Sequence, residues 1–215
     1  MRYEYWDVIL FPAESHIPIQ EFRTACYVSQ AQDGRRLPIL TCFVRSLSPL
    51  SPFRISVHSW TKPTPSSYVE SKRKPEQRVV YTIRVIIDGF RILHNYFEKN
   101  TSWPQQIRNE NRRDCEGTKP TFGFLDSAIR GSSLLFPAFN PSVLSQSSWD
   151  AQESNGRIKV IVAEELISES TSGIAKSGAT NDLICFSFQH APKGMAPPSP
   201  PSPFPHQPST NTPTH

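Results

Sequence analysis

The run VVYTIRVII at residues 79–87, followed by Asp88-Gly89 and a second β-prone run, FRIL, constrains the fold more than any other feature of the chain. Every second residue of the first run is apolar, and the intervening positions include a threonine and an arginine, which is the alternation of a strand with one buried face. An Asp-Gly pair supplies the two positive φ angles that a type I′ turn requires. The sequence therefore predicts a β-hairpin over residues 79–97.

Other short runs are rich in β-branched or aromatic residues and are bounded by Pro, Gly, Ser or Asn. They cover residues 5–11, 38–46, 52–60, 157–163 and 182–189, with 20–29 as a weaker candidate. Because no helical pattern alternates regularly with these strands, the sequence predicts a mainly β protein, an antiparallel β-sandwich, rather than a parallel α/β sheet.

The segments between these strands predict long loops and one short helix. Loops are expected over residues 61–77, 100–131 and 166–181, where Ser, Thr, Gly and Pro are frequent. The helix is predicted to begin with Asn140 as its N-cap and Pro141 at its first position, and to last about two turns.

The C-terminal segment differs in composition from the rest of the chain. Residues 196–215 hold eight prolines and no Asp, Glu, Lys or Arg, so they cannot bury enough apolar area to offset their chain entropy. We therefore predict one folded domain over residues 1–192 and a disordered tail over 193–215. Overlapping Pro-x-x-Pro frames in this tail, which include Pro197, Pro200, Pro201 and Pro203, are typical of ligands for aromatic-lined grooves, although a simple spacer has the same composition.

The chain shows no run of about 20 apolar residues, and its first ten residues carry Glu4 and Asp7, where an export signal would be basic and then uncharged. We therefore expect an intracellular protein of the cytoplasm or nucleus that does not enter a membrane. In such a compartment the four cysteines, Cys26, Cys42, Cys115 and Cys185, are expected to be free thiols.

Seven fragments, in this order along the chain, resemble a group of uncharacterised β-rich proteins of filamentous fungi that share a domain of unknown function. They are PFRISVHSW at 52–60, VIIDG at 85–89, SWPQ at 102–105, LLFPAF at 134–139, SWD at 148–150, GRIKVIVAE at 156–164 and ICFSFQHAP at 184–192. The resemblance covers residues 52–192. It implies the same fold and a fungal source, but it brings no activity, ligand or catalytic residue with it.

Motifs for nucleotide or metal cofactors are missing. The sequence has neither the glycine spacing of phosphate-binding loops nor Cys and His at the short spacings of zinc sites, so we predict no cofactor and no metal. A hydrolase site could be assembled only from distant residues, Ser59, Asp150 and His190, without the Gly-x-Ser-x-Gly elbow. Glu164 and Glu165 point to opposite faces of a strand and cannot serve one glycosidic bond, so we interpret them as a solvated strand end.

Positive charge is concentrated in one segment of a chain whose net charge is +4. Residues 62–113 contain eleven Lys or Arg against five Asp or Glu. Within this segment the run Lys72, Arg73 and Lys74, close to Arg78, is typical of a solvated loop, but it would also suit a nuclear-import address, a nucleic acid or an acidic partner. Tyr68, Trp60 and Trp103 lie near enough in sequence to stack on bases.

These observations favour a non-catalytic β-sandwich module that binds a protein partner through its sheet face or its loops. Two alternatives remain open. A nucleic-acid-associated protein using residues 62–113 would lose its ligand steeply as salt rises, and a small hydrolase would gather Ser59, Asp150 and His190 in one pocket. The partner and the oligomeric state cannot be predicted from the sequence.

Overall fold

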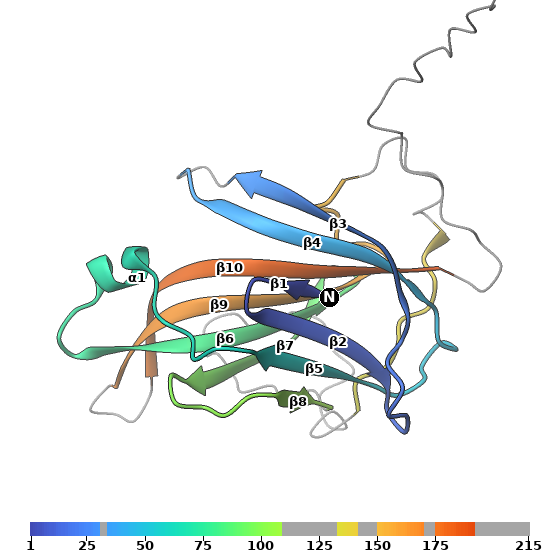
Figure 1. Ribbon diagram of the computed structural model, residues 1–215, viewed down its shortest axis with the longest axis horizontal. Coiled ribbons are helices and arrows are strands. Elements are labelled where there is room, and N and C mark those ends of the chain that lie inside the picture. Colours follow the sequence, from blue (N-terminus) through green and yellow to red (C-terminus); the bar gives the residue numbers. More distant parts are fainter. Residues whose placement is uncertain (31–33, 109–132, 142–149, 170–174, 192–215) are drawn as a thin grey trace, which may run out of the picture.

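The computed structural model describes residues 1–30, 34–108, 133–141, 150–169 and 175–191. They form two facing β-sheets (Figure 1), which confirms the predicted mainly β sandwich. The small sheet has the order β1-β2-β5-β8 and the large sheet the order β3-β4-β10-β9-β6-β7. The strands of the small sheet are β1 (Arg2–Tyr3), β2 (Trp6–Pro12), β5 (Phe53–Ser59) and β8 (Gln105–Ile107). Those of the large sheet are β3 (Glu21–Gln30), β4 (Arg36–Arg45), β6 (Gln77–Ile87), β7 (Phe90–Glu98), β9 (Arg157–Glu169) and β10 (Ala175–Ala191).

The core lies between the two sheets, where alternate residues of each strand meet. From the small sheet, β2 and β5 contribute Trp6, Val8, Leu10, Phe53, Ile55 and Val57. From the large sheet, the central strands contribute Tyr81, Ile83, Val85, Ile158, Val160, Val162, Ile184, Phe186 and Phe188. All of these side chains are almost completely buried. Burying each large apolar side chain contributes roughly 1.5–3 kcal/mol, so this layer is the main source of stability.

The predicted hairpin is confirmed. Strand β6 pairs with β7 in antiparallel register, and Ile87 lies opposite Phe90, so only two residues form the turn. Asp88 has φ 48° and Gly89 has φ 82°, as a type I′ turn requires. The carboxylate of Asp88 also accepts a hydrogen bond of 2.8 Å from the backbone N–H of Gly156. The turn is thereby held against the start of β9 as well as closing the hairpin.

One strand pair departs from the antiparallel prediction. Strand β10 runs parallel to β4, with Cys185 opposite Ile39 and Ala191 opposite Arg45, while every other pair recorded among the described strands is antiparallel. The last strand enters the large sheet between β4 and β9, which are far apart in sequence. Strand order of this kind depends on long-range packing, so the local pattern could not predict it.

The predicted loop at 166–181 is wrong. Strand β9 continues to Glu169 and β10 begins at Ala175, and the two extensions pair with each other, with a register shift between Ser177 and Thr180. The shift is a β-bulge, which accommodates one or two residues without ending the ladder. Of the residues that suggested a loop, the described ones, Ser168, Ser177, Gly178 and Thr180, therefore belong to an irregular strand pair.

The predicted loop at 61–77 contains the helix α1 (Ser67–Lys72), which the sequence did not indicate. Its N-cap is Ser66, whose side chain accepts a hydrogen bond from the N–H of Val69. Val69 is buried against Val79 and Leu166. A helix of six residues is too short to show a 3.6-residue period, so only its packing on the sheet reveals it.

Several predictions fall on parts of the chain that the structure does not describe. They are the body of the predicted helix at 142–149, residues 109–131 of the loop predicted over 100–131, Cys115, and the proline-rich tail from 192 onward. Cys26, Cys42 and Cys185 are free thiols, as predicted. Among the described residues no helix has the length and apolar character needed to cross a bilayer.

We predict that replacing Gly89 with valine lowers the free energy of unfolding by about 1–3 kcal/mol, because a β-branched residue is strained at a positive φ. Urea unfolding followed by circular dichroism measures this difference. The matched variant Gly89→Asn should lose less than about 1 kcal/mol, since asparagine tolerates the left-handed region. Equal losses for both variants would show that the turn conformation does not control the stability of the hairpin.

Candidate functional site

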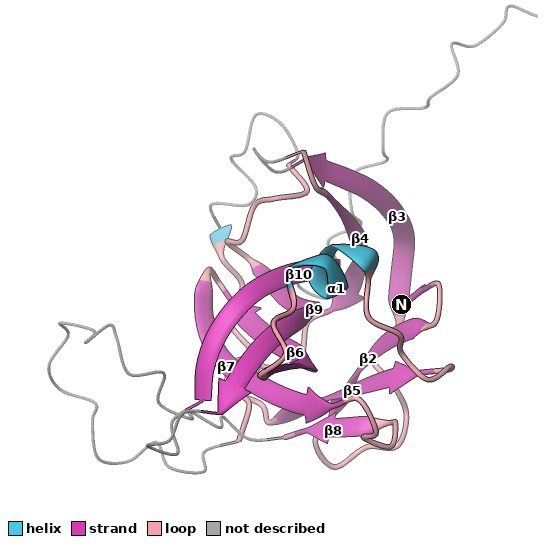
Figure 2. Ribbon diagram, turned by 90° about the vertical axis from the view of Figure 1, so that its left-hand side faces the viewer, coloured by secondary structure: helices cyan, strands magenta, loops and turns pink. Residues whose placement is uncertain are grey.

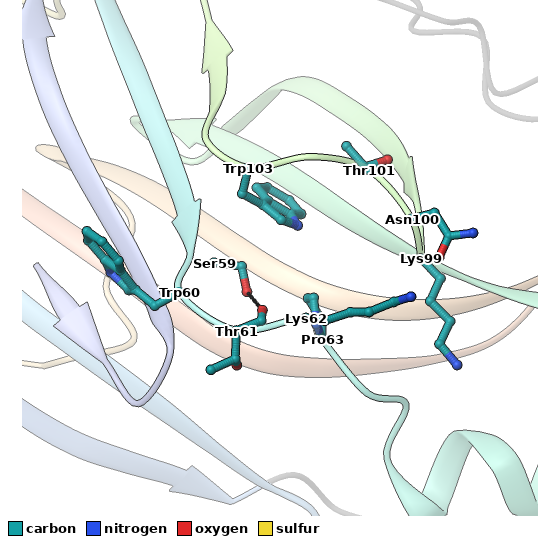
Figure 3. Close-up of a pocket in the computed structure, with 9 residues that line it drawn as sticks. All are labelled: Ser59, Trp60, Thr61, Lys62, Pro63, Lys99, Asn100, Thr101 and Trp103. Atoms are coloured by element: carbon teal, nitrogen blue, oxygen red, sulfur yellow. Dashed lines mark hydrogen bonds between the residues drawn. The ribbon is translucent and has the colours of Figure 1, made fainter.

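A pocket of about 390 Å³ lies where two connections between the sheets pass each other (Figure 3). We call it the tryptophan–lysine pocket. The connection that follows β5 contributes Ser59, Trp60, Thr61, Lys62 and Pro63, and the connection between β7 and β8 contributes Lys99, Asn100, Thr101 and Trp103. About 40 residues of sequence separate the two groups, so the pocket exists only in the folded chain.

The two tryptophans of the pocket have different surroundings. The ring of Trp103 packs edge-on against Trp6, with centroids 5.0 Å apart, and at 5.5 Å from Phe97, so it is fixed to the core. Trp60 is 58% exposed, and it stacks on the His58 ring at 5.8 Å. Figure 3 shows the Trp60 ring turned away from the Trp103 ring, on the other side of the chain. Trp103 therefore forms a wall of the pocket, and Trp60 contributes only to its rim.

The electrostatic character of the tryptophan–lysine pocket is positive. Lys62 and Lys99 are both exposed, and neither forms an ion pair with a carboxylate of the described residues. None of the nine lining residues is acidic. The loop that carries Lys99 is closed by a hydrogen bond of 2.9 Å from the N–H of Thr101 to the carbonyl of Glu98. Two cations therefore line one hollow, and neither has an ion-pair partner within the part of the chain that the structure describes.

The predicted basic run lies elsewhere, at the end of α1 and the start of β6. The ammonium group of Lys72 donates to the hydroxyl of Tyr68 at 2.9 Å. Arg73, which follows α1 as its C-cap, pairs with Glu70 of the helix, and Arg78 pairs with Glu98 across the hairpin. The side chain of Lys74 is exposed. Much of the charge at Lys72, Arg73, Lys74 and Arg78 is therefore engaged within the protein itself.

The residues proposed for a hydrolase site do not come together. Ser59 ends β5, whereas Phe53 begins it, and six residues of strand span about 20 Å. The Phe53 ring contacts Phe136, whose ring lies 5.1 Å from that of His190, so His190 lies at the far end of β5 from Ser59. The carboxylate of Asp150 accepts a hydrogen bond from the backbone N–H two residues on, at 2.8 Å. The three side chains do not form a catalytic triad.

Glu164 and Glu165 point to opposite faces of β9, as predicted, but the interpretation as a solvated strand end is wrong. Both side chains are buried, with 1% and 3% exposure. The Glu164 carboxylate accepts a hydrogen bond of 2.8 Å from the N–H of Ser66, the N-cap of α1. A carboxylate at this position also suits the positive end of the helix dipole, so Glu164 attaches α1 to the large sheet.

Glu165 joins three strands on the outer face of the large sheet. Its carboxylate lies 3.6 Å from Nε2 of His94 on β7 and accepts a hydrogen bond from Ser177 on β10. Burial alone would raise the pKa of Glu165, but the contacts with His94 and Ser177 and the charge of Arg84 lower it below its ordinary value. Glu165 is therefore an ionised, buried group whose charge stabilises the fold. Sequence reasoning missed this role because the partners come from distant strands.

Strand β3 is a terminal strand of the large sheet (Figure 2). Its residues are the most exposed of that sheet. Its only strand partner among the described residues is β4. Phe22 is 38% exposed and Val28 is 54% exposed, which is unusual for large apolar residues of a strand. The pairing is interrupted between Phe22 and Ala25, where Arg23 has φ 52°. The regular part of this edge therefore runs from Ala25 to Gln30.

No group of three or more His, Cys, Asp or Glu side chains within the described ranges is arranged to hold a metal ion.

Comparison with known proteins identifies one protein family that this chain matches. A family model described as "Domain of unknown function (DUF8498)" matches residues 1–197. This match includes the first 51 residues, which lay outside the predicted resemblance. No curated protein and no solved structure matches the chain significantly.

We predict that Glu165→Gln lowers the free energy of unfolding by about 2 kcal/mol at pH 7. The substitution removes a buried negative charge that interacts with His94 and Ser177. The pKa of Glu165 is lower in the folded chain than its ordinary value of 4.5. Its charge therefore stabilises the fold above pH 4.5, and this contribution is lost as pH falls through the lowered pKa.

Urea unfolding at several pH values should show the difference between wild type and Glu165→Gln shrinking below pH 4.5. The control is Glu98→Gln, which removes the exposed ion pair with Arg78 and should cost less than about 1 kcal/mol. A Glu165→Gln difference that does not change with pH would contradict the assigned role.

Proposed function

Because the chain belongs to the DUF8498 family, whose description names no activity, we propose its function from its own surfaces: it is a non-catalytic module that binds an extended segment of a partner protein along β3. The exposure of β3 carries this proposal. A terminal strand presents a row of backbone N–H and C=O groups that another strand can pair with. Strand addition to a sheet edge is a common mode of peptide recognition, in which the backbone supplies affinity and the side chains supply selectivity.

The side chains of β3 support the same conclusion. Residues 24–30, TACYVSQ, carry no charge. Natural sheet edges are commonly protected by lysine, proline or a covering loop, but Val28 here remains more than half exposed. Covering Val28 and Phe22 would remove apolar area from water, which favours association. The partner segment suited to this edge is extended, uncharged and rich in β-branched or aromatic residues.

The length of the regular edge favours a short partner segment over a second copy of the chain. The bulge before Ala25 leaves six residues, Ala25 to Gln30, in continuous register with β4. Two such edges paired with each other would bury much less than the roughly 1,200 Å² typical of stable interfaces. A short peptide strand needs no larger surface, and binding of the transient class is expected.

A catalytic role has less support. The proposed hydrolase residues are separated, and His190 is buried, which lowers its pKa and disfavours its charged form.

The proposed place of action is the cytoplasm or nucleus, since the three described cysteines are free. The proposed fungal source and the role of the tail prolines, Pro197, Pro200, Pro201 and Pro203, as spacer or ligand remain predictions.

The test selects peptides from a displayed library of random extended sequences on the full-length chain. We expect the selected peptides to lack charge and to protect the amides of residues 24–30 from hydrogen exchange. Val28→Lys should weaken their binding at least tenfold, because the charge must be desolvated beside the added strand. Phe90→Lys is the matched control: Phe90 is 76% exposed but lies at the β6–β7 turn, so this variant should bind as the wild type does.

Three results would overturn the proposal. The first is protection elsewhere than at residues 24–30, and the second is equal loss of binding in both variants. The third is a stable dimer, measured by light scattering at micromolar concentration, that Val28→Lys dissociates. That third result would assign β3 to self-association instead.

A further inference from the structure

We infer that the tryptophan–lysine pocket binds a small phosphorylated molecule that carries a planar ring, of which a mononucleotide is the representative. This inference is independent of β3 and goes beyond the proposed protein binding. The pocket is formed by connections at the ends of β5 and β7, whereas β3 is the opposite terminal strand of the large sheet. The argument rests on charge, on one aromatic wall and on size.

The charge of the pocket selects an anion. Lys62 and Lys99 come from different connections, yet both line the same hollow, and Figure 3 shows both side chains directed to the same side of it. No acidic residue lines the pocket, so none of its lining residues offsets the charge of the two ammonium groups. A bound phosphate, which carries between one and two negative charges near neutral pH, would be shared between them. Lysine acts on such a ligand as a point charge, and two lysines suit a terminal phosphate.

The wall of the pocket selects a planar ring. Trp103 is held by its perpendicular contact with Trp6 and by Phe97, so it loses little freedom when a ligand stacks on it. Aromatic side chains that are fixed beside positive charge are the usual platform for nucleobases. Trp60 cannot form a second wall, because its ring is turned away from that of Trp103 and stacks on His58 instead. The ligand is therefore stacked on one side only.

The size and the remaining polar groups select a small molecule. A volume of about 390 Å³ falls within the range of about 300–1,000 Å³ found for small-molecule sites. The amide of Asn100 and the hydroxyl of Thr101 line the pocket and form no hydrogen bond to a described residue. They are available to the hydroxyl groups of a sugar. The planar ring of such a ligand would stack on Trp103, and its sugar would contact Asn100 and Thr101. Its phosphate would be bound by Lys62 and Lys99.

The experiment titrates the full-length chain by calorimetry with adenosine monophosphate, adenosine, inorganic phosphate and a 12-residue oligothymidylate that lacks terminal phosphates. We expect the monophosphate to bind at least tenfold more tightly than adenosine or phosphate alone, because each of these keeps only part of the contacts. Lys62→Ala and Lys99→Ala should each weaken binding of the monophosphate at least fivefold. Lys74→Ala, which removes an exposed lysine outside the pocket, should have no effect.

Tryptophan fluorescence locates the ring of the ligand. The monophosphate should quench the wild type and Trp60→Phe alike, and it should quench Trp103→Phe much less; a thermal melt shows whether that variant is folded. If Trp103→Phe does not fold, the lysine variants decide the question alone. Equal binding of phosphate and monophosphate, an equal effect of Lys74→Ala, or tighter binding of the oligothymidylate would overturn the inference. The last result would assign the pocket to single-stranded nucleic acid.

Discussion

The burial of charged side chains on β9 is the constraint on which the rest of the structure depends. This strand lies within the large sheet, between β6 and β10, and four of its ionisable side chains are at most 5% exposed: Arg157, Lys159, Glu164 and Glu165. A buried charge is tolerated only where hydrogen bonds or opposite charges replace water. Each therefore requires a partner from another segment. Arg157 and Lys159 donate to backbone carbonyls of residues 150–152, Glu164 accepts from the start of α1, and Glu165 joins β7 to β10.

The same arrangement explains why β3 differs from the other long strands. The contacts of these four side chains reach β7, β10, α1 and the segment at 150–152. Strand β3 is separated from β9 by β4 and β10. One side-chain contact, from Gln152 to Ser29, links it to the segment at 150–152. Its ladder partner among the described strands is β4.

Local signals predicted the strands and the hairpin well, because a period of two and an Asp-Gly turn act over a few residues. The order of the strands, including the parallel pair of β10 and β4, depends on contacts between segments more than 140 residues apart in sequence, which no local pattern contains. The site was less predictable. Glu164 and Glu165 were interpreted as solvated because two adjacent charges usually are, whereas their partners, Ser66 and His94, are distant in sequence. Trp60 and Trp103 were noted as stacking candidates, but only the fold shows that Trp103 alone faces the pocket.

The two proposed binding surfaces are far enough apart to act at the same time. The large sheet has six strands, hence five spacings of about 4.8 Å, so β3 and β7 lie about 24 Å apart along the sheet. A peptide strand added beyond β3 would extend the sheet away from the tryptophan–lysine pocket, and steric competition between the two ligands is not expected. Any influence of one on the other would have to pass through the sheet. The rigid element available for it is β9, since its buried charges connect β6, β7 and β10, and a change in its register would disturb all of them together.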